Sequence, residues 1–189
     1  MAEQTDALSA EDSAARAFQA LLGLARQCRK SARGLPAQVD IKPHWSGIGF
    51  ELLGRRFVAP MGEVTEMLEV PPYTRLPGVQ PWVKGVSNVR GRLLPVCDLA
   101  AFFGERLTTG RKLQRILILE NDELYTGLMV DRVFGMQHFP VDTYSDQVSS
   151  EHPASAFSRG CYRQDDVEWI VFSPALLSQD GQFLNAASA

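Results

Sequence analysis

The first part of the chain holds one long helical pattern, over residues 9–33. Its apolar residues recur at spacings of three and four, as on one face of a helix: Ala14, Phe18, Leu21, Ala25 and Cys28. Ser9, with Asp12 three residues later, is a variant of the capping box, and Gly34 can end the helix. A helix that packs on the main domain is the favoured interpretation, ahead of a helix that binds a partner.

From Ile48 onward the pattern changes to short apolar runs separated by turn residues. The preceding segment, residues 35–44, has prolines and no periodicity, and is interpreted as a linker. Strands are predicted over residues 48–52, 57–61, 63–70, 82–89, 92–98, 115–120, 124–139 and 167–172. Breaks at intervals of about 8–12 residues favour an all-β sandwich or barrel over a sheet with helical crossovers.

Two short helices and one long loop interrupt the predicted strands. One helix follows the potential N-cap Asp98 and ends at Gly104, and the other follows Ser173 with proline at its first position. Each comes directly after a strand, which hints at two barrels of similar plan. Residues 141–157 are polar and are predicted to form a long crossover loop.

Composition places the chain among ordinary globular proteins. It has 189 residues, of which 45% are hydrophobic and 22% charged, values that exclude wholesale disorder. The sequence contains no apolar run of membrane-spanning length and no secretory signal at its start. Three widely spaced cysteines argue against a disulfide framework and for a reducing compartment: Cys28, Cys97 and Cys161. We therefore expect a soluble, cytoplasmic protein.

The charge is distributed unevenly along the chain. The net charge is −3, and residues 111–189 alone hold six basic and eleven acidic side chains. A generic nucleic-acid-binding protein needs a basic surface. The excess of negative charge in the last third therefore argues against nucleic acid as a partner.

Motifs for catalysis or for cofactor binding are weak. None of the three histidines lies three to five residues from another histidine or a cysteine, so no zinc spacing is present. Cys97 with His138 is a conceivable nucleophile and base, but Cys97 lies in the apolar run LLPVC, which is typical of a core residue. The glycines around residue 49 do not form a phosphate-binding loop. We expect no enzyme activity, no cofactor and no metal.

Three charged residues interrupt apolar segments and are candidates for binding. Arg90 lies at the apex of a predicted hairpin, Glu66 lies within a strand, and Asp131 interrupts LMVDRV. Each also has a structural interpretation: a solvated or carbonyl-bound turn arginine, an exposed alternating position, and a turn cap. The residues alone leave the structural and the binding roles equally open.

At the hairpin the sequence resembles the signature of the CheW-like family of chemotaxis adaptors. The resemblance rests on WVKGVSNVRGRLLPVCDL (82–99), on the upstream VTEM (64–67) and TRLP (74–77), and on the downstream TGLMVDRV (126–133). Several motifs in the same order, from about Trp45 to Leu177, make a chance match improbable. Within the family, WSGIGFELLGRRFVAPMGEV and VFGMQHFPVDTYS are similar to members from type IV pilus chemosensory systems.

The resemblance implies an all-β, CheW-like fold of two SH3-like β-barrels with short helices, to which this chain adds an N-terminal helix. The implied organisation is a helix and linker over residues 1–44 and a CheW-like domain over 45–183. Subdomains are expected at roughly 45–110 and 111–172, followed by a tail over 184–189.

The resemblance further implies a non-catalytic adaptor. Such a protein joins the cytoplasmic tip of a chemoreceptor to the regulatory domain of a CheA-type histidine kinase, here in control of twitching motility at membrane receptor arrays. The family's kinase contacts fall on Val64, Glu66 and Met67. Its receptor-facing or groove residues fall on Asn88, Arg90, Gly91, Val133 and Met136.

Two rival functions remain open. A nucleic-acid-binding SH3-like or OB-like barrel would need a basic face with interleaved aromatic residues. An enzyme dependent on Cys97 is the weaker rival. Failure to bind DNA at any salt concentration would remove the first rival.

Overall fold

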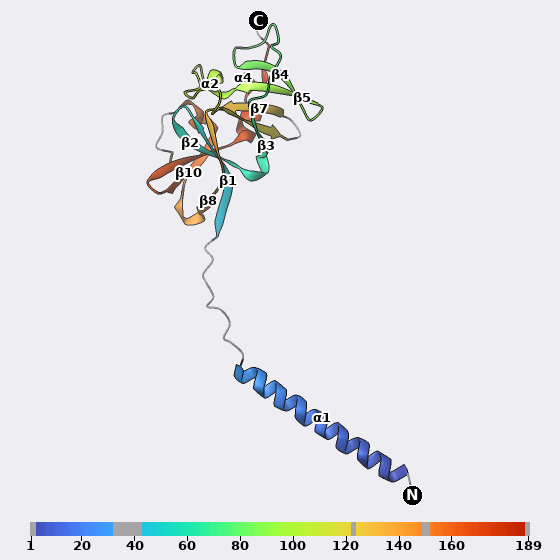
Figure 1. Cartoon of the computed structure of the whole chain (residues 1–189). Helices are drawn as coiled ribbons and strands as arrows, with labels where there is room; N and C mark the ends of the chain where they lie inside the picture. Colours follow the sequence, from blue (N-terminus) through green and yellow to red (C-terminus); the bar gives the residue numbers. More distant parts are fainter. Residues whose placement is uncertain (1–2, 32–42, 122–123, 149–151, 188–189) are drawn as a thin grey trace. The chain divides into compact units, whose positions relative to one another are not determined.

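The computed structural model describes residues 3–31, 43–121, 124–148 and 152–187, with side chains from residue 15 onward. It divides into two compact units, Met1–Ile41 and Lys42–Ala189, and each is described by itself. The first unit contains helix α1 (Glu3–Ser31), and the second, here called the β unit, contains two sheets (Figure 1). No helix in the described part of the chain is long and apolar enough to cross a membrane.

Helix α1 begins six residues before the predicted start, so Ser9 lies inside the helix and is not its cap. Glutamate, glutamine, alanine and leucine are good helix formers, and carboxylates favour the first turns, which explains the longer helix. The predicted stop at Gly34 and the linker lie outside the described residues. Packing of the helix on the β unit stays a prediction.

The first sheet has six strands in the order β8-β1-β2-β11-β10-β9. Their bounds are β1 His44–Leu52, β2 Arg55–Pro60, β8 Arg132–Pro140, β9 Tyr144–Ser145, β10 Ser158–Gln164 and β11 Val167–Phe172. Neighbouring strands are antiparallel except for β2 and β11, which run parallel. The pattern of the sequence did not predict β10.

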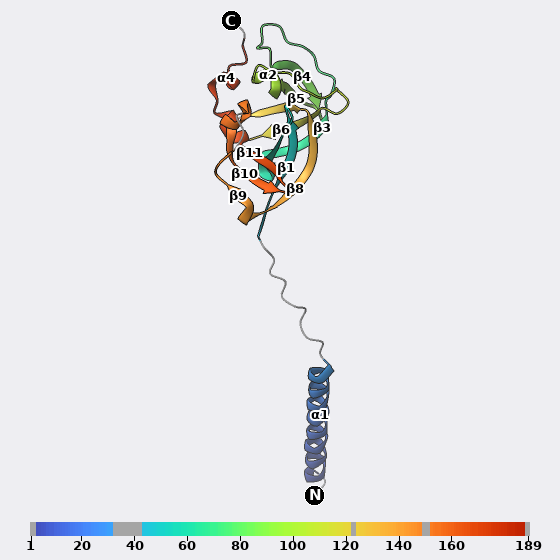
Figure 2. The same ribbon diagram turned by 90° about the vertical axis from the view of Figure 1, so that its left-hand side faces the viewer.

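The second sheet has five strands in the order β3-β6-β7-β5-β4. They are β3 Val64–Glu69, β4 Val83–Val89, β5 Arg92–Asp98, β6 Arg115–Glu120 and β7 Tyr125–Val130. Here β5 and β7 form the parallel pair. Figures 1 and 2 show β4 and β5 toward the end of the β unit that carries the C-terminus, and β8 toward the opposite end.

Helices α2 (Leu99–Phe102) and α3 (Pro174–Ser178) each follow a strand that takes part in a parallel pair. Helix α2 comes directly after β5, and α3 directly after β11. The side chains of Asp98 and Ser173 accept hydrogen bonds from the first turns of these helices, so both predicted caps are confirmed. Each sheet therefore contains two hairpins joined by a parallel pair, with further strands at its ends: β8 and β9 in the first sheet and β3 in the second. That each sheet closes into an SH3-like barrel stays a prediction.

The expected subdomain boundary at residue 110 does not match the sheets. Strands from residues 44–60 and 132–172 form the first sheet, and strands from residues 64–130 form the second. The order of the strands in the sequence does not give this division, because β8 returns to pair with β1 and β11 returns to pair with β2. The expected tail also contains structure: α4 (Gly181–Leu184) precedes Ala187, which pairs with Val79.

Three short 3₁₀ helices lie in the described connections. They are η1 Met61–Glu63, η2 Val141–Thr143 and η3 Pro153–Phe157. The predicted crossover loop over residues 141–157 therefore contains η2, β9 and η3 in its described part.

One large apolar core lies between the two sheets. It combines side chains of the first sheet, such as Phe50 and Phe57, with those of the second, such as Leu117 and Leu128. Each sheet also covers a smaller cluster of its own. In β6, Leu117 belongs to the shared core and Ile116 to the smaller cluster, so this strand is buried on both faces, which is typical of an apolar run such as RILILE.

Asp131 joins the two sheets where the chain passes from β7 to β8. Its side chain is buried, and its carboxylate accepts hydrogen bonds from the backbone N–H groups of Leu53 and Thr109, both at 2.8 Å. Its own N–H donates to the carbonyl of Glu51. The carboxylate therefore ties the β1–β2 turn and the loop before β6 to the crossing point, a larger structural role than the predicted turn cap.

Candidate interaction surface

Strand β3 lies at one end of the five-stranded sheet and pairs only with β6. Its second edge has no strand partner among the described residues, so its backbone groups are free to meet another chain. Met67 lies on this strand with 41% of its surface exposed. An exposed methionine on an open strand edge is a flexible apolar contact for a partner.

Val64 does not belong to this exposed surface. Its side chain is 9% exposed and packs in the core shared by the two sheets. The pairing of β3 with β6 shifts register between Val64 and Glu66, so Val64 lies opposite Leu119 and Met67 opposite Leu117, on the same face of the sheet. Val64 therefore offers little surface for the expected kinase contact, whereas Met67 and Glu66 are more accessible.

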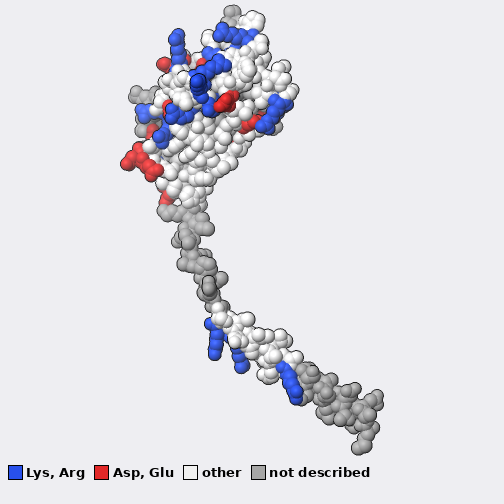
Figure 3. All heavy atoms as spheres, viewed as in Figure 1, with Lys and Arg blue, Asp and Glu red and all other residues white. Residues whose placement is uncertain are grey.

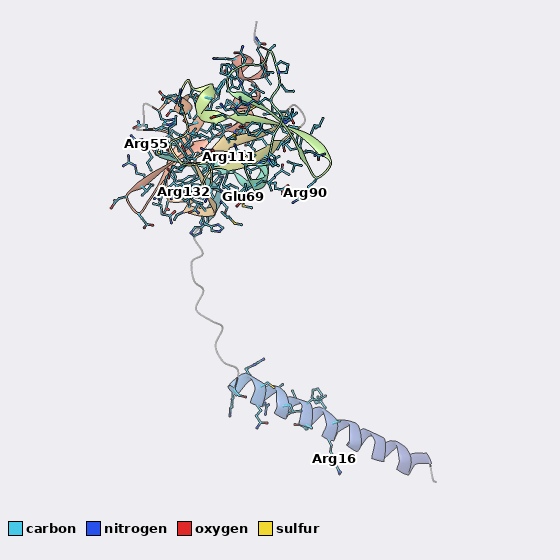
Figure 4. All side chains as sticks on the ribbon, turned by 45° about the horizontal axis from the view of Figure 1, so that its top comes forward. Arg16, Arg55, Glu69, Arg90, Arg111 and Arg132 are labelled. Carbon is cyan, nitrogen blue, oxygen red and sulfur yellow. The ribbon has the colours of Figure 1, made fainter. Side chains whose placement is uncertain are left out.

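Glu66 and Arg90 form an ion pair, with 2.5 Å between Glu66 Oε1 and an Arg90 guanidinium nitrogen. Glu66 lies on β3, and Arg90 lies at the turn of the β4–β5 hairpin, at the side of the β unit in Figure 4. The Arg90 side chain is 78% exposed and that of Glu66 22%. The pair connects two candidate binding elements that are far apart in the sequence.

The hairpin turn holds Arg90 in an unusual backbone conformation. Arg90 and Gly91 have φ angles of 49° and 82°, both in the left-handed region that a two-residue hairpin turn requires. Asn88 Oδ1 accepts a hydrogen bond from the Gly91 N–H at 2.9 Å, which stabilises the turn. Asn88 and Gly91 therefore shape the turn, and Arg90 is the member of the group whose side chain a partner can reach.

A second ion pair lies beside the first. Arg92 Nη1 lies 2.8 Å from Glu120 Oε1, and its guanidinium lies 4.0 Å from the centre of the Tyr125 ring. The hydrogen bond with Glu120 holds the pKa of Arg92 above its ordinary value. We call Glu66, Arg90, Arg92, Glu120 and Tyr125 the ion-pair surface. They line a depression of about 180 Å³.

Sequence reasoning did not select Arg92, Glu120 or Tyr125. The sequence indicated two of them only weakly: Arg92 follows the hairpin apex directly, and Glu120 ends the apolar run RILILE. Since the three residues come from β5, β6 and β7, only the register of the sheet brings them together.

Val133 and Met136 lie on the other sheet, on its edge strand β8. Val133 is half-buried against the shared core, whereas Met136 is 51% exposed. Gly135, with φ at 78°, accompanies an irregularity in the pairing of β8 with β1. The structure thus divides the expected receptor-facing residues between two sheets, and Met136 is the accessible one on β8.

The conceivable pair of Cys97 and His138 is not formed. Cys97 is buried and its sulfur lies 3.5 Å from Thr126 Oγ1, whereas His138 Nδ1 lies 2.7 Å from Ser46 Oγ. Burial raises the pKa of the Cys97 thiol, which keeps it in the unreactive protonated form at neutral pH. Within the described residues, no three histidine, cysteine or carboxylate side chains are grouped as metal ligands.

Comparison with known proteins identifies the family. The sequence model of the CheW-like domain matches residues 46–182. The chain belongs to the CheW-like family. It is 52% identical over 171 residues to Protein PilI of Pseudomonas aeruginosa, covering 90% of this chain and 96% of PilI. The resemblance to the pilus-system members of the family is thereby confirmed.

More distant CheW-like proteins match part of the chain. Chemotaxis protein CheW of Helicobacter pylori is 28% identical over 105 residues, covering 56% of this chain and 64% of that protein. The crystal structure of the scaffolding protein TtCheW from Thermoanaerobacter tengcongensis superposes with a TM-score of 0.64 at 23% identity. It covers 74% of this chain and 96% of TtCheW, which confirms the CheW-like fold.

Proposed function

We propose that this protein is a non-catalytic adaptor that couples the cytoplasmic tip of a chemoreceptor to a CheA-type histidine kinase. Its similarity to PilI supports a role in a chemosensory system that controls type IV pili. The observation that carries the proposal is the ion pair between Glu66 and Arg90, because it joins the candidate kinase strand to the candidate receptor hairpin.

The kinase's regulatory domain meets strand β3 in this proposal. The strand offers an open edge, the exposed Met67 and the partly buried carboxylate of Glu66. Apolar contact supplies affinity, and a charged group beside it supplies register and a faster association. A regulatory domain of the same fold presents an equivalent edge, which allows the two barrels to pack in a pseudo-symmetric pair.

The receptor tip meets the β4–β5 turn at Arg90 and the edge strand β8 at Met136. A receptor carboxylate that pairs with Arg90 competes with Glu66 for the guanidinium and so loosens the bond between Glu66 and Arg90. Glu66 then becomes available to the kinase, so each partner changes the free energy with which the other binds. By linkage, this coupling is reciprocal.

The charges argue against the nucleic-acid-binding alternative. Three arginines of the second sheet are paired with carboxylates: Arg90 with Glu66, Arg92 with Glu120 and Arg115 with Glu69. Figure 3 shows blue and red spheres mixed over one face of the β unit. A phosphate backbone would have to compete with these carboxylates at each contact.

Calorimetric titration of the full chain with the kinase's regulatory domain tests the proposal. Met67→Arg replaces an exposed apolar contact by a charge, and we expect it to weaken binding about tenfold or more. Leu184→Arg is the matched control, since Leu184 is 52% exposed at the end of α4, outside the second sheet. Equal binding of both variants and the wild type would place the interface elsewhere.

A charge exchange separates the two roles of Glu66. Glu66→Arg alone leaves two arginines facing each other, and adding Arg90→Glu restores an internal pair of opposite polarity. If Glu66 contacts the kinase directly, the double variant stays weak. Recovery of wild-type affinity would mean that Glu66 only positions Arg90, contrary to the proposal.

A further inference from the structure

Helix α1 carries an apolar face that its own unit does not cover. Phe18, Leu21 and Leu24 are 61%, 64% and 58% exposed. Single helices are marginally stable in water, and most helices in proteins are stabilised by packing of their apolar face. A helix that extends over Glu3–Ser31 with large exposed apolar side chains therefore needs an apolar partner.

The helix sequence is divided into an acidic and a basic half. All its acidic residues precede Ser13, and all its basic residues follow Ala15: Glu3, Asp6, Glu11 and Asp12, then Arg16, Arg26, Arg29 and Lys30. Figure 3 accordingly shows only blue charges on the described part of the helix, and Arg16 projects outward in Figure 4. The best complement to this charge pattern is the same helix in the opposite direction.

The sizes of the apolar residues follow the same division. Residues at alternating spacings of three and four form a seam along one side of the helix. The seam has alanines in its first part and larger residues later: Ala7, Ala10, Ala14, Ala17, Leu21, Leu24 and Cys28. In an antiparallel pair centred between Ala17 and Phe18, Leu21 of one helix lies opposite Ala14 of the other. At the same alignment Leu24 lies beside Ala10 and Cys28 opposite Ala7, so the two leucines of the seam meet alanines and can pack closely.

We propose that α1 is a dimerisation element that pairs antiparallel with α1 of a second copy of this chain. The same alignment places Asp6 of one helix opposite Arg29 of the other, twice in each symmetric pair. A parallel pair would instead place like charges together and alanine against alanine. The dimer presents two β units to their partners and so adds avidity to weak single contacts.

Sedimentation velocity of the full chain, over a range of protein and salt concentrations, is the first test. We expect a species of about 42 kDa, twice the 20.9 kDa of one chain. Leu21→Glu with Leu24→Glu should give a monomer. Gln19→Glu, which adds charge on the opposite side of the helix, should leave the dimer intact. A wild type that stays monomeric at its highest soluble concentration would overturn the proposal, as would a dimer insensitive to the leucine changes.

Charge exchange tests the direction of the helices. Asp6→Arg or Arg29→Asp alone should weaken dimerisation about threefold to tenfold, because each replaces two attractive contacts by repulsion. The double variant should recover the wild-type dissociation constant within about a factor of two. Single variants without effect, or a double variant without recovery, would contradict antiparallel pairing.

Cysteine crosslinking gives an independent distance test. Cys28 is exposed whereas Cys97 and Cys161 are buried, so a single native thiol reports on the helix. In Ala7→Cys, mild oxidation should give a covalent dimer through a bond between positions 7 and 28. The two positions lie about 30 Å apart along one helix, so a parallel pair cannot form this bond. Crosslinking between two Cys28 residues in the wild type would overturn the antiparallel arrangement.

Discussion

Replacement of Asp131 should destabilise the β unit strongly, because its carboxylate holds the crossing between the two sheets. In Asp131→Ala, the N–H groups of Leu53 and Thr109 lose their acceptor in a region with little access to water. A buried donor without a partner costs about 1–3 kcal/mol. The two donors together predict a loss of about 4 kcal/mol in the free energy of unfolding.

Asp131→Asn keeps the shape of the side chain but removes its charge and one of its two acceptor oxygens. The amide keeps one acceptor oxygen, which can serve Thr109, but turns its NH₂ group toward the N–H of Leu53. One donor is then unpaired, and we expect a loss of about 2 kcal/mol. Asp166→Asn is the matched control: Asp166 is exposed at the β10–β11 turn, and the same chemical change there should alter stability by less than about 0.5 kcal/mol.

Urea unfolding followed by tryptophan fluorescence measures these differences, because all three tryptophans lie in the β unit. With a slope of about 2 kcal/mol/M, the midpoint should fall by about 2 M for Asp131→Ala and about 1 M for Asp131→Asn. If Asp131→Ala unfolds at the same midpoint as Asp166→Asn, the carboxylate does not join the sheets.

Three further outcomes follow from the structure. Arg90→Gly should relieve the left-handed backbone strain, so the melting temperature should stay or rise while receptor pull-down falls; a large drop in melting temperature would make Arg90 structural. Gly85→Ala should lower the unfolding midpoint sharply, since a Cβ there would lie 2.0 Å from the Thr74 carbonyl oxygen; an unchanged midpoint would contradict this close approach. Burial lowers the pKa of His152, so protonation favours unfolding and stability should fall as the pH drops below about 6.5. His152→Asn should remove this part of the pH dependence in urea titrations at pH 7.5 and 5.5, and an unchanged dependence would exclude His152 as its source.

The strands with strong patterns were predictable from the sequence, and β10 was not. Ser158–Gln164 begins with serine and arginine and ends with arginine and glutamine, and only Gly160, Cys161 and Tyr162 are buried. Its strand conformation comes from pairing with β11 and β9, which no local pattern reveals. The chain turns between β10 and β11 at Asp165 and Asp166, which both have the positive φ angles of a tight turn.

The sequence indicated which charged residues belong to the candidate site, but not how these residues are arranged in space. A lone glutamate in an apolar strand and an arginine at a hairpin apex marked Glu66 and Arg90, but nothing in the sequence showed that they form a pair. The burial of Val64 could not be predicted from strand alternation, because the pairing of β3 with β6 shifts register between Val64 and Glu66. The sheet partition was not predictable, since it depends on strand pairings between distant parts of the chain.

The most direct test of the adaptor function is a bridging measurement with three purified components. A receptor tip fragment is immobilised, and retention of the kinase's regulatory domain is measured with and without the full chain. We predict that the kinase domain is retained only when the adaptor is present, and that Met67→Arg and Arg90→Gly each abolish retention while the proteins remain folded. Retention that does not depend on the adaptor, or two partners that displace one another from it, would contradict the coupling function.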